Sequence, residues 1–240
     1  MKKIYFFVEG QTEAIFVEQF LLAYMGYHNL KLERHKYISQ YMSEKVIMRE
    51  NPNAKYEVRI YDVGGDSNVT SKIKEKAESL IKDNGYDYIV GLHDLYRVKI
   101  DGEKIKKEEK KKIIEAFKKL FKNKDSYDKI KYVLAIMETE AWFLMDYKMF
   151  CKIDGALIPS FIKNELGYDL INDNPESYGH PTNIIDKIYH LCGKKYGKHE
   201  DDSYKIAYNL DYTDLCCNNE YRNKVSSWNY FLDCIDLVFE

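Results

Sequence analysis

Apolar residues in the first 150 positions alternate between two spacings, which predict alternating strands and helices. Short runs rich in aromatic and β-branched residues predict four buried strands, at residues 4–8, 56–63, 86–92 and 130–137. Apolar residues at helical spacing fall between the runs, as at Val69, Ile73 and Ala77, and Gly85 is placed to end that helix. This alternation predicts an α/β fold with a mostly parallel central sheet flanked by helices.

After about residue 150 the pattern becomes helical and less regular. One apolar stripe contains Ile184, Ile188 and Leu191, and another runs from Trp228 to Val238 near the end of the sequence. We therefore expect residues 1–150 to form the α/β core and residues 151–240 to form a helical C-terminal extension packed on it.

Composition narrows the class of protein without selecting a function. The chain has 240 residues, of which 45% are hydrophobic and 32% charged, and this excludes a disordered chain. The formal net charge is −2, so attraction to phosphates would have to come from local patches. Five cysteines without a C-x-x-C pair favour a reduced, cytoplasmic setting. No apolar stretch is long enough for a membrane span.

Carboxylates follow each of the four predicted strands. They are Glu9 after the first, Asp62 and Asp66 at the second, Asp94 after the third, and Glu138 and Glu140 after the fourth. Ligands of an open parallel sheet bind at the carboxyl ends of its strands, so these acids should share one crevice. One or two acids, especially Glu13 and Glu140, could simply complement helix N-termini. A whole rim of carboxylates would repel itself unless a cation neutralised it, which favours a metal site.

The predicted site suits a particular kind of ion and reaction. Carboxylate oxygens are hard ligands, so Mg²⁺ or Mn²⁺ is the expected cofactor. Such an ion can polarise a phosphoryl oxygen and generate hydroxide from bound water, which points to phosphodiester hydrolysis or transfer. The sequence contains neither a Walker loop nor a G-x-G-x-x-G motif, which gives an ATPase or a dinucleotide enzyme little support.

Several motifs together resemble the Toprim superfamily of topoisomerases, primases and overcoming-lysogenization-defect nucleases. They are Val8-Glu9-Gly10-Gln11-Thr12-Glu13, Gly64-Gly65, His93-Asp94-Leu95-Tyr96 and the stretch from Glu138 to Asp146. More narrowly, the chain resembles a Toprim-like branch of bacterial proteins of unknown function, many from defence or mobile-element loci. This resemblance continues through Pro175-Glu176, Pro181, residues 194–198 and the closing helix that starts near Trp228, and so covers most of the chain.

The resemblance implies roles for individual residues. Glu9 corresponds to the Toprim glutamate, a general acid/base or metal-associated group, and Asp94 to the first aspartate of the D-x-D pair, a metal ligand. Tyr96 stands in place of the second aspartate. Glu138 or Glu140 could restore the missing carboxylate from the neighbouring strand; if neither does, a site with one ion or none is the alternative. The expected catalytic residues are therefore Glu9, Asp94, Glu138 and Glu140, and the expected metal ligands are Glu9, Asp94 and Glu138.

Two lysine-rich segments are candidates for a nucleic-acid surface. Residues 99–125 contain eleven lysines and six acids, and residues 194–198 combine three lysines with Tyr196. Each segment could instead be a solvated surface, a crossover helix in the first case and a plain loop in the second. If they bind phosphates, the expected contacts are Lys106, Lys107, Lys110, Lys111, Lys194, Lys195 and Lys198.

Three functions remain open from the sequence. The first is a metal-dependent nuclease of a bacterial defence or mobile-element system. The second is a catalytically degenerate Toprim-like module that binds nucleic acid or a nucleotide within a larger complex. The third is metal-dependent phosphotransfer or hydrolysis on a small nucleotide. The expected partners are DNA or RNA, with a partner ATPase and a homodimer as further candidates, and no membrane.

Overall fold

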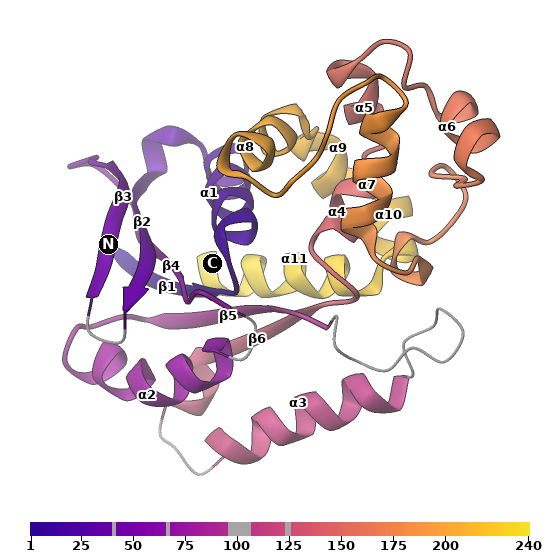
Figure 1. Cartoon of the computed structure of the whole chain (residues 1–240). Coiled ribbons are helices and arrows are strands. Elements are labelled where there is room, and N and C mark those ends of the chain that lie inside the picture. Colours follow the sequence, from indigo (N-terminus) through magenta and orange to yellow (C-terminus); the bar gives the residue numbers. More distant parts are fainter. Residues whose placement is uncertain (40–41, 66–67, 96–106, 123–125) are drawn as a thin grey trace.

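A six-stranded sheet forms the centre of the computed structural model, which describes residues 1–39, 42–65, 68–95, 107–122 and 126–240 (Figure 1). The strands are β1 (Lys2–Val8), β2 (Leu30–Ser39), β3 (Met42–Arg49), β4 (Tyr56–Asp62), β5 (Tyr88–Asp94) and β6 (Ile130–Ala135). They lie in the order β3-β2-β4-β1-β5-β6, and every neighbouring pair is parallel except the antiparallel β2–β3 hairpin. The predicted α/β fold with a mostly parallel sheet is confirmed.

The β2–β3 hairpin is the part of the sheet that the hydrophobic pattern did not predict. Leu30 and Leu32 of β2 are buried, but the strand continues through the charged residues Glu33 and Arg34, which are buried as well. Arg34 is paired with Glu18 of the first helix, Nε to Oε2 at 3.0 Å. A strand whose buried positions include charged residues gives no continuous apolar run, because its side chains are neutralised by partners that are distant in sequence.

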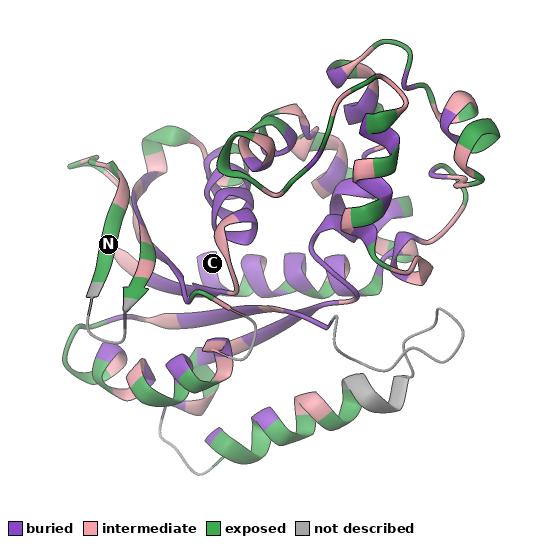
Figure 2. Cartoon of the chain, in the orientation of Figure 1, coloured by how far each residue is buried: buried purple, intermediate pink, exposed green. Residues whose placement is uncertain are grey.

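Helices cover both faces of the sheet. Helix α1 (Gln11–Met25) packs on one face, while α2 (Asn68–Lys82) and α3 (Lys107–Phe121) lie on the other (Figure 1). Buried residues run along almost the whole of α1 (Figure 2), because the helix lies between the sheet and the C-terminal helices. Its Phe20 packs against Phe231, with ring centroids 5.0 Å apart.

The second half of the chain is helical and packs on the α1 face. Its helices are α4 (Glu140–Met145), α5 (Lys148–Ile153), α6 (Pro159–Leu166), α7 (Pro181–His190), α8 (Glu200–Asn209), α9 (Tyr212–Cys217), α10 (Asn219–Lys224) and α11 (Ser226–Phe239). The described residues also form three single-turn 3-10 helices, η1 (Tyr27–Asn29), η2 (Tyr127–Lys129) and η3 (Pro175–Ser177). One continuous apolar core contains residues from β1 through α11, so the C-terminal helices share their core with the sheet. Within the described ranges, no helix has both the length and the apolar character needed to cross a membrane.

Glu176 fixes the start of α11 against the rest of the C-terminal half. Its carboxylate accepts hydrogen bonds from the backbone N–H groups of Ser226 at 3.3 Å and Ser227 at 2.8 Å. The hydroxyl of Ser227 in turn accepts the indole N–H of Trp142 at 2.8 Å. A carboxylate at a helix N-terminus satisfies N–H groups that lack an intrahelical partner. This network fixes the start of α11 relative to α4 and so positions the residues at the start of α4.

Candidate metal centre

Three buried carboxylates from three segments meet at the carboxyl edge of the sheet. Glu13 lies in the first turn of α1, Asp94 is the last residue of β5, and Glu140 is the first residue of α4. One oxygen atom of each lies within 4.8 Å of the others. Their exposed fractions are 4%, 9% and 0%, which makes this an interior cluster and not a solvated acidic patch. The three residues could hold a metal ion.

Residues that follow β1 and β6 set the position of Asp94. Its Oδ1 accepts two hydrogen bonds from Thr139, from the backbone nitrogen at 3.1 Å and from the hydroxyl at 2.9 Å. The backbone nitrogen of Asp94 donates to Oε2 of Glu9 at 3.1 Å, which links the ends of β5 and β1. Because β1, β5 and β6 are parallel neighbours, their carboxyl ends deliver all of these groups to one edge.

Glu140 receives a hydrogen bond and an ion pair on one oxygen and no hydrogen bond on the other. Its Oε1 accepts the phenol hydroxyl of Tyr196 at 3.1 Å and lies 2.9 Å from Nζ of Lys198. Its Oε2 is buried without a hydrogen-bond partner. Buried polar atoms are almost always hydrogen-bonded, so an unpartnered carboxylate oxygen in an acidic cluster is suited to a cation.

Burial and mutual repulsion disfavour the charged forms of these acids. Burial, followed by the charge of Glu140, raises the pKa of Glu13 to about 8. Burial raises the pKa of Asp94 well above its usual range, and the charges of Glu13 and Glu9 raise it further. The pKa of Glu140 is also raised by burial, although Lys198 opposes the shift. A divalent cation would reverse this balance, because it stabilises the ionised forms.

A pocket of about 370 Å³ opens beside the cluster. Its lining comes from the ends of β1, β4 and β5, the first turn of α1 and the segment before α8: Glu9, Gly10, Gln11, Thr12, Glu13, Asp62, Gly64, Gly65, Asp94 and Lys198. Gly64 has φ +73°, and a Cβ atom there would lie 2.7 Å from the ring of Tyr37, so only glycine fits this turn. The volume falls in the usual range of small-ligand sites, about 300–1,000 Å³.

Those of the expected acids that the structure describes lie at this edge, with different surroundings. Glu9 and Asp94 line the pocket, and Glu140 belongs to the buried cluster. Glu138 is engaged elsewhere, since its Oε2 accepts the backbone N–H of Thr182 at 2.8 Å and its Oε1 lies 3.8 Å from Nζ of Lys198. The buried cluster of Glu13, Asp94 and Glu140 is called the triad below. Of the expected ligands Glu9, Asp94 and Glu138, only Asp94 belongs to it.

The sequence suggests only that Glu13 complements the N-terminus of its helix. The structure places it in the first turn of α1 and also in the carboxylate cluster. The sequence does contain a sign that Glu13 belongs to the site, since it lies only four residues after Glu9. A residue in the first turn of a helix stays close to the end of the preceding strand. Asp62 lines the pocket and accepts the backbone N–H of Gly64 at 2.8 Å. Asp66 and Tyr96 lie outside the described residues.

The loop of residues 194–198 contributes one lysine to the site. Lys198 reaches Glu140, whereas Lys194 donates to the backbone oxygen of Ile153 at 2.8 Å and Lys195 is exposed. The ring of Tyr196 is only 3% exposed, so it is not available to stack on a base.

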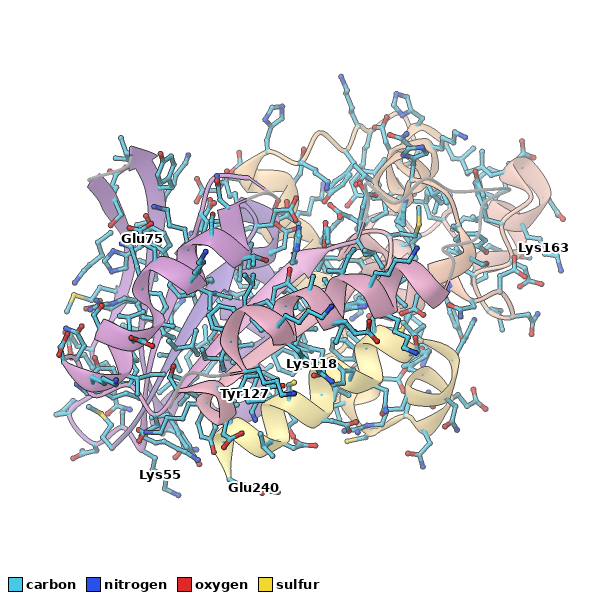
Figure 3. All side chains as sticks on the ribbon, turned by 90° about the horizontal axis from the view of Figure 1, so that it is seen from below. Lys55, Glu75, Lys118, Tyr127, Lys163 and Glu240 are labelled. Atoms are coloured by element: carbon cyan, nitrogen blue, oxygen red, sulfur yellow. The ribbon has the colours of Figure 1, made fainter. Side chains whose placement is uncertain are left out.

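The lysines of the other segment whose side chains the structure describes lie on α3 or just after it, on the face of the sheet opposite α1. Lys106 and the side chains of Lys107 and Lys110 lie outside the described residues, and Lys111 is exposed on α3. Figure 3, viewed from the side of α2 and α3, shows α3 in front and labels its residue Lys118. Nucleic-acid binding by these lysines stays a prediction.

Comparison with known proteins gives one match. A family model described as "Domain of unknown function (DUF4276)" matches residues 8–223. Searches of the curated proteins and of the solved structures each found no match. The matched span contains the three carboxylates of the triad, Lys198 and every residue that lines the pocket. The chain therefore belongs to the DUF4276 family.

Proposed function

We propose that this protein hydrolyses phosphodiester bonds in DNA or RNA, with Mg²⁺ or Mn²⁺ held by Glu13, Asp94 and Glu140. The observation that supports this most strongly is the convergence of three buried carboxylates next to an open pocket, with Oε2 of Glu140 unpartnered. Carboxylate oxygens suit these ions, which supply a positive charge for phosphate oxygens and lower the pKa of a bound water.

The chain's own groups would perform the remaining steps. Glu9 lines the pocket next to Asp94, and in this proposal it takes a proton from the attacking water. The backbone N–H groups of Gln11 and Thr12 belong to the first turn of α1, where N–H groups have no intrahelical acceptor, and both residues line the pocket. Phosphate oxygens bind well at such a helix start.

The Toprim-like relationship is part of the same proposal. It is supported by the positions of the shared motifs, since Glu9-Gly10 follows β1 and His93-Asp94 ends β5, both at the pocket. In this interpretation Glu140 supplies the carboxylate of the second D-x-D aspartate, whose position Tyr96 occupies. A role in bacterial defence or in a mobile element, a partner ATPase and a homodimer belong to this proposal as well.

A catalytically degenerate binding module is the second candidate. The ammonium of Lys198 lies 2.9 Å from Glu140, and it offsets part of the charge of the cluster without a metal ion. A protein of this kind would bind nucleic acid or a nucleotide and leave it intact.

The test is cleavage by the purified protein with Mg²⁺, with Mn²⁺ and with EDTA. Substrates should include supercoiled DNA, single strands and structured RNA, with and without an ATPase encoded beside the gene. Asp94→Asn and Glu140→Gln should lose at least about a hundredfold in rate, as expected when groups that hold charge in the transition state are removed. Glu165→Gln, which alters an exposed acid on α6, is the matched control and should cleave normally. Cleavage by Asp94→Asn at the wild-type rate would exclude this site, and an inert wild-type protein that still binds nucleic acid would favour the binding module.

A further inference from the structure

Lys198 lies between the buried acids and the pocket. Its Nζ lies 2.9 Å from Oε1 of Glu140 and 3.8 Å from Oε1 of Glu138. The side chain is 35% exposed, and it also lines the pocket beside Glu9 and Asp94. The ammonium can therefore interact with the buried carboxylates and also with a ligand in the pocket.

The backbone around Lys198 is held in an uncommon conformation. Lys198 has φ +55°, a region that residues other than glycine seldom adopt. Two acids hold the preceding residues: Oδ1 of Asp186 accepts the backbone N–H of Tyr196 at 2.9 Å, and Oδ2 of Asp202 accepts that of Gly197 at 2.8 Å. A strained residue persists only where its surroundings enforce it, so the fold itself directs this lysine at the cluster.

Lys198 is also the one cation among the residues that line the pocket, as far as the described part of the chain extends. Glu9, Glu13, Asp62 and Asp94 line the same pocket, so a phosphate that enters it meets several negative charges. An anionic substrate needs positive charge there, and a single divalent ion on the triad would leave part of the phosphate charge uncompensated.

We propose that Lys198 is a built-in counter-ion, which a divalent cation displaces from Glu140 and which then binds a phosphate oxygen of the substrate in the pocket. This inference rests on the proposed metal centre. Mg²⁺ lies about 2.1 Å from its ligand oxygens, so an ion on Oε2 of Glu140 would lie a few ångströms from an ammonium on Oε1. The two cations repel each other at that distance, and the flexible lysine stem is the group that can move.

If the metal ion and Lys198 compete for Glu140, removal of the lysine charge should strengthen metal binding and weaken phosphate binding. Lys198→Met keeps the length of the side chain and removes its charge. The variant should bind Mn²⁺ roughly tenfold more tightly than the wild type, because a repelling charge near the ion is gone. With saturating Mn²⁺ it should bind inorganic phosphate several-fold more weakly, because the mobile ammonium is gone. A purely structural lysine would weaken both.

Isothermal titration calorimetry with Mn²⁺, and then with inorganic phosphate on the Mn²⁺-saturated protein, measures both responses. Lys198→Arg keeps the charge and should bind Mn²⁺ as the wild type does. Lys205→Met, which removes an exposed charge from α8, should change neither affinity. Lys198→Gly is a second neutral variant that suits the left-handed backbone, in case the methionine variant folds poorly.

Each outcome decides the inference separately from the proposed function. Unchanged or weaker Mn²⁺ binding by both neutral variants would overturn the inference, whether or not the wild type cleaves nucleic acid. Tighter Mn²⁺ binding and weaker phosphate binding, without any cleavage by the wild type, would support the inference and remove the nuclease proposal. Absence of Mn²⁺ binding in every protein, including the neutral variants, would overturn both.

Discussion

Thr139 donates two hydrogen bonds to the same oxygen of Asp94, from its backbone nitrogen at 3.1 Å and from its hydroxyl at 2.9 Å. The bonds join the turn after β6 to the end of β5. Neither of these hydrogen bonds involves the other oxygen of Asp94, Oδ2. The pair of bonds therefore fixes the orientation of the central carboxylate of the triad, and Thr139 is itself fully buried.

Removing the hydroxyl of Thr139 should disturb both folding and metal binding. Thr139→Val keeps the shape of the side chain and should lower the free energy of unfolding by about 1–3 kcal/mol, since a hydrogen bond to a buried carboxyl is removed. It should also weaken Mn²⁺ binding, because Asp94 is less well oriented. Chemical denaturation and calorimetry measure the two effects. Thr139→Ser keeps the hydroxyl and should restore Mn²⁺ affinity; failure to do so would mean that Thr139 acts through packing.

Glu13 and Glu138 distinguish the geometric triad from the ligand set expected from sequence. Glu13→Gln should abolish the rise in melting temperature that Mn²⁺ gives the wild type, since an ion stabilises only the state that binds it. Glu138→Gln should keep most of that rise, because Glu138 is occupied with Thr182 and Lys198. Thermal unfolding with and without Mn²⁺ measures both. The reverse result, with Glu138 required and Glu13 dispensable, would assign the ion to the outer acids.

Acid pH should lower the free energy of unfolding through protonation of Glu33 in β2. Burial alone would raise the pKa of Glu33, but the hydrogen bonds from Lys45 and His35 and the charge of Arg59 lower it to about 2. A carboxyl whose pKa is lowered on folding adds stability above its unfolded value of about 4.3, and that stability is lost as the pH falls toward 2. The free energy of unfolding should therefore decline over this window, and Glu33→Gln should show a shallower decline. Parallel pH profiles for the two proteins would contradict this assignment.

The exposed lysines of α3 should matter only if nucleic acid passes over that face. Lys111, Lys112, Lys118 and Lys119 are exposed. Changing all four to Gln should weaken binding and reduce the salt slope of log K by roughly one for each phosphate that is no longer neutralised. Fluorescence anisotropy over a range of salt concentrations measures both. An unchanged slope would identify α3 as a solvated crossover helix. Lys74, Lys76 and Lys82 of α2, changed together, provide a comparison on the neighbouring helix.

Local sequence was sufficient for much of the fold. The aromatic and β-branched runs predicted β1, β4, β5 and β6, and the predicted boundaries of all four lie within two residues of those observed. The helical stripe beginning at Val69 predicted α2, whose residues Val69, Ile73 and Ala77 are buried. These features depend on burial of one face or of a whole strand, which leaves a periodic trace in the residues themselves.

The β2–β3 hairpin and the position of β4 required tertiary structure. Glu33 and Arg34 are buried in β2 because partners from other segments neutralise them: Arg59 and Lys45 for Glu33, and Glu18 for Arg34. Nothing in the local sequence specifies such partners. Pairing of β4 between β2 and β1 is likewise a non-local choice, since residues 30–39 and 56–62 pair although β3 lies between them in the sequence.

The sequence by itself determined that an acidic rim would occupy the carboxyl edge of a parallel sheet, because strand ends and acids can both be located locally. Only the tertiary structure decided which acids meet. Glu13, Asp94 and Glu140 come together as a triad, while Glu138 is bound by the start of α7. It also decided that Lys198, more than fifty residues beyond Glu140, would supply the ammonium. Distances between side chains depend on how whole elements pack, and a one-dimensional pattern does not encode that packing residue by residue.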